Sequence, residues 1–263
     1  MAYYITYGEL QRHLKEYAER TGRRMQFPEM TDYLYRKGIL SDTRPKDIPV
    51  HKMFREMSDE EFEKIMDAMI LTLTPNLQMS PHVTEATIIP MERDVFIIRH
   101  PRYTRSISHY HNYFEINFVA SGSCTFHFEG ESRILSEGEF CILAPGSQHS
   151  LMINDESTIF NIMIRKSTFN TSFFSVMLQK DLLAHFFRTI LQGDSHPNYL
   201  LFFIRDSAHI KTIIHNAMGE CYKRDPYSNS NCAVTVRHCS FIIIRWGRTF
   251  PWCCSMSSIT TRR

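Results

Sequence analysis

Two histidines and a glutamate in the middle of the chain are spaced like residues on one face of a β-strand. His109 and His111 are two positions apart, and Glu115 follows an even number of positions later. Side chains of a strand alternate between its two faces, so all three point the same way if the strand is unbroken. We therefore predict that these three side chains converge on one side of a strand.

A second pattern follows further along the chain and ends in another histidine. Gly138 precedes an apolar run, Pro145 and Gly146 form a turn signal, and His149 comes shortly after them. A short apolar run between turn residues is typical of a buried strand. The pattern therefore predicts a buried strand, a tight turn and a third histidine placed just after that turn.

Together, the two patterns resemble the two motifs of the cupin family. The first cupin motif joins His-x-His to a glutamate and a glycine, and the second joins a glycine, a Pro-Gly turn and a histidine. The matching residues are His109, His111, Glu115, Gly122, Gly138, Pro145, Gly146 and His149. The resemblance implies a small β-barrel, with the glycine and proline positions at structural turns.

The segments around both motifs are similar to the sensor domain of AraC/XylS-type transcription regulators. They read Tyr-Phe-Glu-Ile-Asn-Phe-Val at 113–119 and Leu-Ala-Pro-Gly-Ser-Gln-His at 143–149. The resemblance implies a barrel that binds a small effector or dimerises, then helices, then a pair of helix-turn-helix units that hold DNA. We therefore expect a small-molecule effector and a homodimer, and DNA as a partner only of a full-length relative.

Short apolar runs separated by turn signals continue the strand pattern beyond the two motifs. We predict strands within residues 95–98, 114–120, 124–128, 132–135 and 158–164. Short strands at regular spacing indicate an all-β barrel or sandwich. If the large aromatic residues of these runs face inward, they fill the barrel and leave a pure dimerisation module. These aromatic residues are Phe114, Phe118, Phe126 and Phe128.

Helical patterns lie on both sides of the predicted barrel. A capping box at Thr6 opens one helix, and another at Ser58 opens a helix that we expect to run to Pro75. Helical periodicity returns after Lys166 and again from Asp206. The predicted fold class is therefore α+β, a cupin barrel (double-stranded β-helix or jelly roll) flanked by helices on both sides.

These patterns divide the chain into four regions. We predict a helical N-terminal region at 1–78, a cupin β-barrel sensor domain at 80–166, a helical dimerisation or linker region at 167–225 and an atypical tail at 226–263. The tail contains no lysine and no acidic residue. This change in composition, in a segment too short for a helix-turn-helix pair, predicts a tail that is disordered or read out of frame, with the DNA-binding half missing.

The cysteines of the tail offer a competing hypothesis. Four of the seven cysteines of the chain lie there, and they would form a zinc site only if they converge. They are Cys232, Cys239, Cys253 and Cys254. Their spacing matches no common zinc pattern, so we favour the out-of-frame interpretation.

Composition sets wider limits on compartment and partners. The chain has a formal net charge of +2 and a pI of about 8.1, which does not by itself indicate a nucleic-acid surface. The sequence starts without the features of a secretory signal, and no apolar run is as long as a membrane span. We therefore expect a cytoplasmic protein with reduced cysteines and no membrane partner.

The chemistry of the site residues leaves two functions open. Three imidazoles and a carboxylate at His109, His111, Glu115 and His149 suit a divalent first-row metal, and an open coordination position would permit oxygenase or isomerase chemistry. Alternatively, the same side chains line a polar effector pocket or are satisfied groups at the barrel mouth. The long flanking helices favour a regulator over a small metal-dependent cupin enzyme, so we assign no catalytic residue and no certain cofactor.

Overall fold

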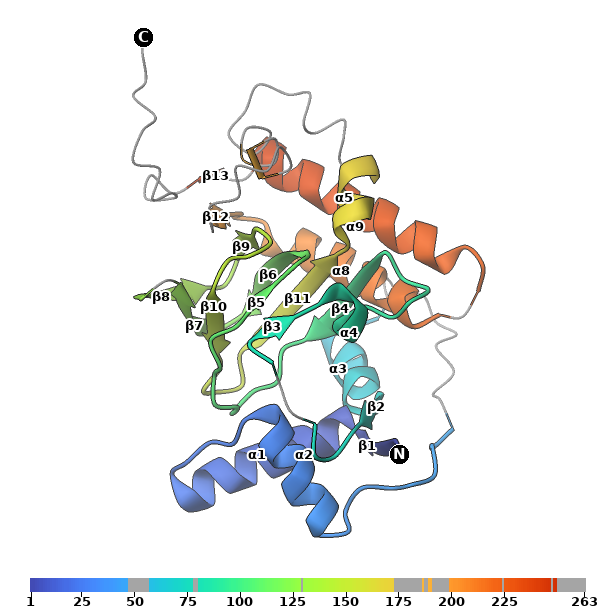
Figure 1. Cartoon of the computed structure of the whole chain (residues 1–263). Helices are drawn as coiled ribbons and strands as arrows, with labels where there is room; N and C mark the ends of the chain where they lie inside the picture. Colours follow the sequence, from blue (N-terminus) through green and yellow to red (C-terminus); the bar gives the residue numbers. More distant parts are fainter. Residues whose placement is uncertain are drawn as a thin grey trace.

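The computed structural model describes residues 1–46, 57–77, 80–128, 130–172, 186, 189–190, 199–223, 225–246 and 248–249. In these residues two antiparallel sheets face one another, and helices cover the outer face of the larger sheet (Figure 1). The fold is α+β, a cupin-type barrel flanked by helices, as predicted. Within the described part of the chain, no helix combines the length and the apolar character of a bilayer span.

The larger sheet has the strand order β13-β12-β9-β6-β11-β4. Its strands are β4 (Val95–Arg99), β6 (Phe114–Ser121), β9 (Glu139–Leu143), β11 (Thr158–Ile164), β12 (Tyr199–Phe203) and β13 (Arg248–Thr249). The smaller sheet has the order β10-β7-β8 and consists of β7 (Ser123–Phe128), β8 (Glu131–Ser136) and β10 (His149–Met152). A short strand, β5 (Tyr110–His111), pairs in parallel with β3 (His82–Val83) just before β6 begins.

Strand β6 shows how the sequence divides between the two faces of the larger sheet. Phe114, Ile116 and Phe118 pack in the apolar cluster beneath the helices, whereas Val119 packs between the two sheets. Glu115 shares the face of Val119 and is therefore buried inside the barrel. Phe114 and Phe118 do not fill the barrel, because alternation along the strand turns them outward.

The apolar cluster between the sheets occupies one part of the barrel interior. Phe126 and Phe128 of β7 do face inward, and their ring centroids lie 5.6 and 4.4 Å from that of Tyr199 on β12. Phe126 also lies beside His149, with 6.3 Å between the ring centroids. This apolar cluster therefore borders His149 through Phe126.

Two turn glycines have a conformation and surroundings that a larger residue would not tolerate. Gly122, between β6 and β7, has a φ of 73°, and a Cβ there would lie 2.0 Å from Ser157 Oγ. Gly138, between β8 and β9, has a φ of 83°, and a Cβ would lie 2.7 Å from the carbonyl oxygen of Ile204. Glycine is required at both positions because it alone adopts this backbone without strain or clash.

The N-terminal region has an apolar core of its own. It contains β1 (Tyr3–Thr6), α1 (Tyr7–Thr21) and α2 (Phe27–Arg36), and α1 begins at the predicted capping box. Its buried side chains belong to a cluster separate from those of the barrel. The members of this cluster are Ile5, Leu10, Leu14, Met30, Leu34, Leu40 and Leu73.

The helix predicted after Ser58 is shorter than expected. α3 (Asp59–Asp67) begins at the capping box of Ser58 and Glu61, but it does not run to Pro75. The next apolar residues form β2 (Ile70–Leu73), which pairs antiparallel with β1. Pairing with a strand distant in the sequence overrides the helical spacing of the apolar residues here, because the backbone groups of β1 and β2 hydrogen-bond to one another.

The region predicted as helical at 167–225 is mixed. It contains α5 (Lys166–Ser172) and α8 (Ser207–Tyr222), which agree with the prediction, but β12 lies between them and pairs with β9. The five apolar residues of β12 have the length of a buried strand, and they form an additional strand of the larger sheet. Much of the helical periodicity predicted after Lys166 falls on residues 173–185, which lie outside the described residues.

The tail contradicts our expectation of disorder over its first half. α9 (Ser228–Trp246) is a helix, and Cys232, Val236 and Cys239 are buried in the same cluster as the outer face of the barrel sheet. Cys232 Sγ lies 3.1 Å from Cys221 Sγ on α8. Residues 228–239 therefore belong to the folded protein. Cys253 and Cys254 lie outside the described residues, so the zinc hypothesis stays untested.

Polar contacts fix the start of α9 to the start of β4. Buried Arg93 donates from Nη1 to Ser228 Oγ at 2.7 Å and from Nη2 to the carbonyl oxygen of Lys223. The amide of Asp94 donates to Asn229 Oδ1 at 2.8 Å. These contacts explain why α9 has one defined position against the barrel.

We predict that Ser228→Ala lowers the free energy of unfolding by about 1–3 kcal/mol, because it leaves a buried guanidinium nitrogen of Arg93 without a partner. Urea unfolding at neutral pH measures this change. Ser230→Ala, two positions along the same helix at an exposed residue, is the matched control and should be close to neutral. Equal effects of the two substitutions would contradict a docked α9.

Candidate functional site

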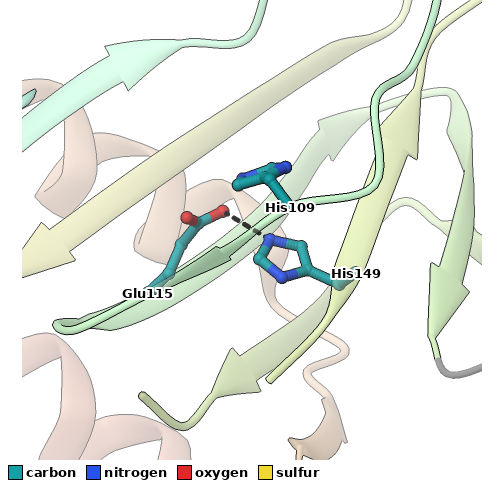
Figure 2. Close-up of side chains that lie close together, drawn as sticks. All are labelled: His109, Glu115 and His149. Atoms are coloured by element: carbon teal, nitrogen blue, oxygen red, sulfur yellow. Dashed lines mark ion pairs between the residues drawn. The ribbon is translucent and has the colours of Figure 1, made fainter. Parts of the chain in front are cut away.

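The four residues singled out in the sequence lie together at one end of the barrel. His111 is in β5, Glu115 in β6 and His149 at the start of β10. His109 pairs with His149 through two backbone hydrogen bonds of 2.9 Å, which holds the two histidines opposite one another. Figure 2 shows His109, Glu115 and His149 converging, with Glu115 and His149 on different strands.

Distances within the group place Glu115 at its centre. Its Oε2 lies 3.3 Å from His111 Nε2, and its Oε1 lies 3.8 Å from His149 Nε2 (Figure 2). One ligand atom each from His109, Glu115 and His149 lie within 4.8 Å of one another. His111, Glu115 and His149 are all at most 3% exposed, so this is an interior site and not a surface cluster.

Backbone carbonyl oxygens hold all three imidazoles by their Nδ1 atoms. These oxygens, of Ile107, Tyr113 and Ser147, lie 3.0, 2.8 and 3.0 Å from Nδ1 of His109, His111 and His149 respectively. A neutral imidazole that donates from Nδ1 carries its lone pair on Nε2.

This arrangement sets acceptors against one another at the centre of the site. The Nε2 atoms of His111 and His149 are buried and make no hydrogen bond. An unprotonated Nε2 facing the carboxylate of Glu115 brings two electron-rich atoms together. Such a pair is stable only with a proton or a cation between them, or with a ligand that supplies donors.

The carboxylate of Glu115 is an anion at neutral pH. Burial alone would raise its pKa, but His111 and His149 lower the pKa well below its usual value when each presents a proton on Nε2 to the carboxylate. Asn161 of β11 adds a hydrogen bond of 2.9 Å from Nδ2 to Oε1. The site therefore holds a fixed negative charge inside the barrel.

His100, which follows β4, is a member of the site that sequence reasoning missed. Burial lowers the pKa of its imidazole to about 4, partly offset by the charge of Glu115, and Asn161 also lies close to the ring. Burial and the neighbouring His149 also lower the pKa of His109. His100 follows no motif, and only the pairing of β4 with β11 brings it beside Glu115.

Two asparagines extend the polar surface along the wall of the larger sheet. Asn117 lies two residues after Glu115 on β6, and it is paired in register with Asn161 on β11. Neither amide atom of Asn117 has a hydrogen-bond partner, and Oδ1 of Asn161 also lacks one. The same-face spacing from Glu115 could have identified Asn117, whereas Asn161 requires knowledge of the strand pairing.

The residue set fits two kinds of occupant. Three imidazoles and one carboxylate are the donor set that first-row divalent metals take, and His109, Glu115 and His149 are close enough to share one ion. The unpartnered amide atoms of Asn117 are suited instead to an organic ligand that both donates and accepts hydrogen bonds. The geometry thus defines a barrel with a buried polar cluster.

The fold and this cluster define the class, a cupin barrel with buried polar residues at one end of its interior. Residues 94–192 match the family model described as AraC-like ligand binding domain. A comparison with curated proteins gave no significant match.

Solved structures of two kinds resemble the chain. An apo variant of ToxT from Vibrio cholerae is 18% identical, with 56% of this chain and 53% of that chain covered and a TM-score of 0.37. A cupin-2 domain protein from Shewanella frigidimarina is 22% identical, with 27% and 69% covered and a TM-score of 0.24. KdgF from a Halomonas species is 19% identical, with 28% and 71% covered and a TM-score of 0.26. The chain thus spans about half the length of the ToxT structure.

We predict that Asn117→Val raises the free energy of unfolding of the ligand-free protein by about 1–2 kcal/mol, because it removes two buried polar atoms that lack partners. Guanidinium unfolding measures the change. The matched control is Asn161→Val on the paired position. It should destabilise the protein by about 1–3 kcal/mol, because Glu115 loses its amide donor. A loss of stability in both variants would contradict the unpartnered state of Asn117.

Proposed function

We propose that the chain is the effector-sensing and dimerisation part of an AraC-type transcription regulator. The family match of residues 94–192 supports a ligand-sensing role. The observation that carries the proposal is the set of buried polar atoms without partners around Glu115 and Asn117. Buried polar groups are nearly always hydrogen-bonded in proteins, so an interior cluster of unpartnered ones favours a bound effector as the missing partner.

The proposed signal leaves the barrel through the ends of β4 and the loop that follows it. The carbonyl oxygen of His100 accepts a hydrogen bond of 3.2 Å from the hydroxyl of Tyr7 on α1. The amide of Arg102 donates to Gln11 Oε1 at 2.9 Å. The loop between His100 and His109 therefore contacts the N-terminal helices directly, and an effector that moves either histidine changes those contacts.

On the other side, β4 is joined to α8. The hydroxyl of Tyr222 donates a hydrogen bond of 3.2 Å to the carbonyl oxygen of Ile97. The thiol of Cys221 donates one of 3.6 Å to the carbonyl oxygen of Val95. We propose that α8 and its neighbours form the homodimer. An effector acts on them only to the extent that it binds one arrangement of the helices better than another.

In this proposal, DNA binding belongs to a helix-turn-helix domain of a full-length relative. A chain with only the sensing part binds its effector and dimerises. It forms mixed dimers with intact copies and lowers their output, which a co-expression reporter assay detects.

We predict that the effector raises the midpoint of thermal unfolding of the full chain, because ligand binding to the folded state stabilises it. A thermal-shift screen of small metabolites at fixed pH identifies such a compound. Its effect should be lost in Asn117→Val and retained in His127→Ala, which changes a histidine on β7 outside the cluster. A stabilising compound whose effect survives Asn117→Val would place the effector elsewhere.

A small metal-dependent cupin enzyme is the second candidate function, favoured by the close approach of His109, Glu115 and His149. These three residues would hold the ion, and Nε2 of His111 could join them. A bound divalent metal supplies Lewis-acid polarisation of a substrate oxygen or a nucleophile at neutral pH. In this function, Asn117 and Asn161 orient the substrate beside the ion.

We predict that chelator-treated protein binds about one equivalent of Zn²⁺ or Ni²⁺, and that His149→Ala weakens the affinity by at least about tenfold. Calorimetric titration and elemental analysis measure this. His127→Ala is again the control and should bind like the unchanged protein. Unchanged metal affinity in His149→Ala would contradict a metal site at these residues, and the enzyme hypothesis would then fail.

A further inference from the structure

A cavity lies outside the barrel, where α3, the first turns of α8 and the turn between β8 and β9 meet. Its volume is about 310 Å³. Ala120 and His215 are its buried members, and Asp59, Glu137 and Lys211 are the charged residues of its lining. The cavity shares none of its lining with the polar cluster around Glu115, and its size is within the range of small-molecule sites.

His215 brings an unmet hydrogen-bonding group to this cavity. The residue is 6% exposed, and its Nε2 is buried without a hydrogen-bond partner. Its ring stacks on Phe62 of α3, with 3.5 Å between the centroids and an interplanar angle of 5°. Burial lowers the pKa of this imidazole to about 4, so it is neutral at physiological pH. A polar nitrogen held this rigidly in a cavity is a feature that a ligand would satisfy.

The charges of the lining favour a cation. Lys211 Nζ lies 2.6 Å from Asp59 Oδ2, so this ammonium group is already paired. Glu137 Oε1 accepts one hydrogen bond of 3.3 Å from the Ser207 hydroxyl and carries the remaining negative charge. An anion would have to compete with Asp59 for the lysine, whereas a cation meets an available carboxylate.

We propose that this cavity is a second ligand site, which takes a small organic cation with amine or guanidine groups. One of its N–H groups donates to Nε2 of His215, and the others bond to Glu137 and to the hydroxyl oxygens of Ser207 and Thr212. The site is independent of the proposed effector site. Because its walls come from α3, α8 and a barrel turn, occupancy strengthens the attachment of both helices to the barrel.

Agmatine, which carries an amine and a guanidinium group, is the probe for this proposal, and succinate is its anionic counterpart. We expect agmatine, at several-fold excess over its Kd, to raise the Tm of the full chain by roughly 2–4 °C at neutral pH. Succinate at the same ionic strength should leave the Tm unchanged. Absence of a shift with agmatine, or an equal shift with succinate, overturns the proposal.

Variants locate the site. Glu137→Gln, on an exposed turn, should weaken agmatine binding about tenfold in calorimetric titration, whereas Glu131→Gln, an exposed glutamate at the start of β8, should not. His215→Phe keeps the ring stacked on Phe62 and should also weaken binding. If that variant does not fold, the comparison of Glu137→Gln with Glu131→Gln decides alone, and equal affinities in those two overturn the proposal. Glu115→Gln should retain agmatine binding, and its loss there would place the ligand in the barrel and refute a second site.

Discussion

A negative charge buried inside the barrel is the constraint around which the rest of the site is arranged. Glu115 is 3% exposed and cannot reach bulk water. Its charge is tolerated because the amide of Asn161 donates to it and because His111 and His149 can each hold a proton between Nε2 and the carboxylate. The same constraint fixes the imidazole orientations, since each ring must present Nε2 inward while a carbonyl oxygen holds Nδ1. The site is thus organised in advance of any ligand.

The position of that charge depends on one strand pairing. β11 lies between β6 and β4 in the larger sheet, so it places Asn161 opposite Asn117 and sets His100, after β4, beside Glu115. β4 and the residue after it then contact both helical regions, through the carbonyl oxygen of Ile97 on one side and that of His100 on the other. A change at the centre of the barrel therefore has a short path of direct contacts to either group of helices.

The sequence contains enough information to predict the barrel and its four motif residues, because strand alternation and turn glycines are local signals. Glu115 faces inward because Phe114 and Ile116 on either side of it face outward, and this alternation can be read from the sequence alone. His100 and Asn161 could not be found in this way. Their place in the site follows from which strands pair, and pairing between segments some sixty residues apart leaves no periodic trace.

Two other errors share one physical cause. β2 and β12 were expected to be helical or to lie in helical regions, because apolar residues in short runs suit either structure. In both cases a partner strand distant in sequence decided the outcome. For the tail, an unusual composition was taken as a sign of a disordered or out-of-frame segment. Its first half is instead a helix whose apolar and cysteine side chains cover part of the outer face of the sheet, and the out-of-frame hypothesis stays untested.

Because α9 packs against the barrel, the smallest unit that can fold extends beyond residue 225. A fragment that ends at residue 225, the boundary suggested by composition, would expose the apolar surface that Cys232, Val236 and Cys239 cover. It would also remove Ser228, which accepts a hydrogen bond from the buried guanidinium of Arg93. Expression of the sensing region for crystallisation or ligand screening thus calls for an endpoint beyond Trp246. Shorter fragments would expose this apolar surface and self-associate through it.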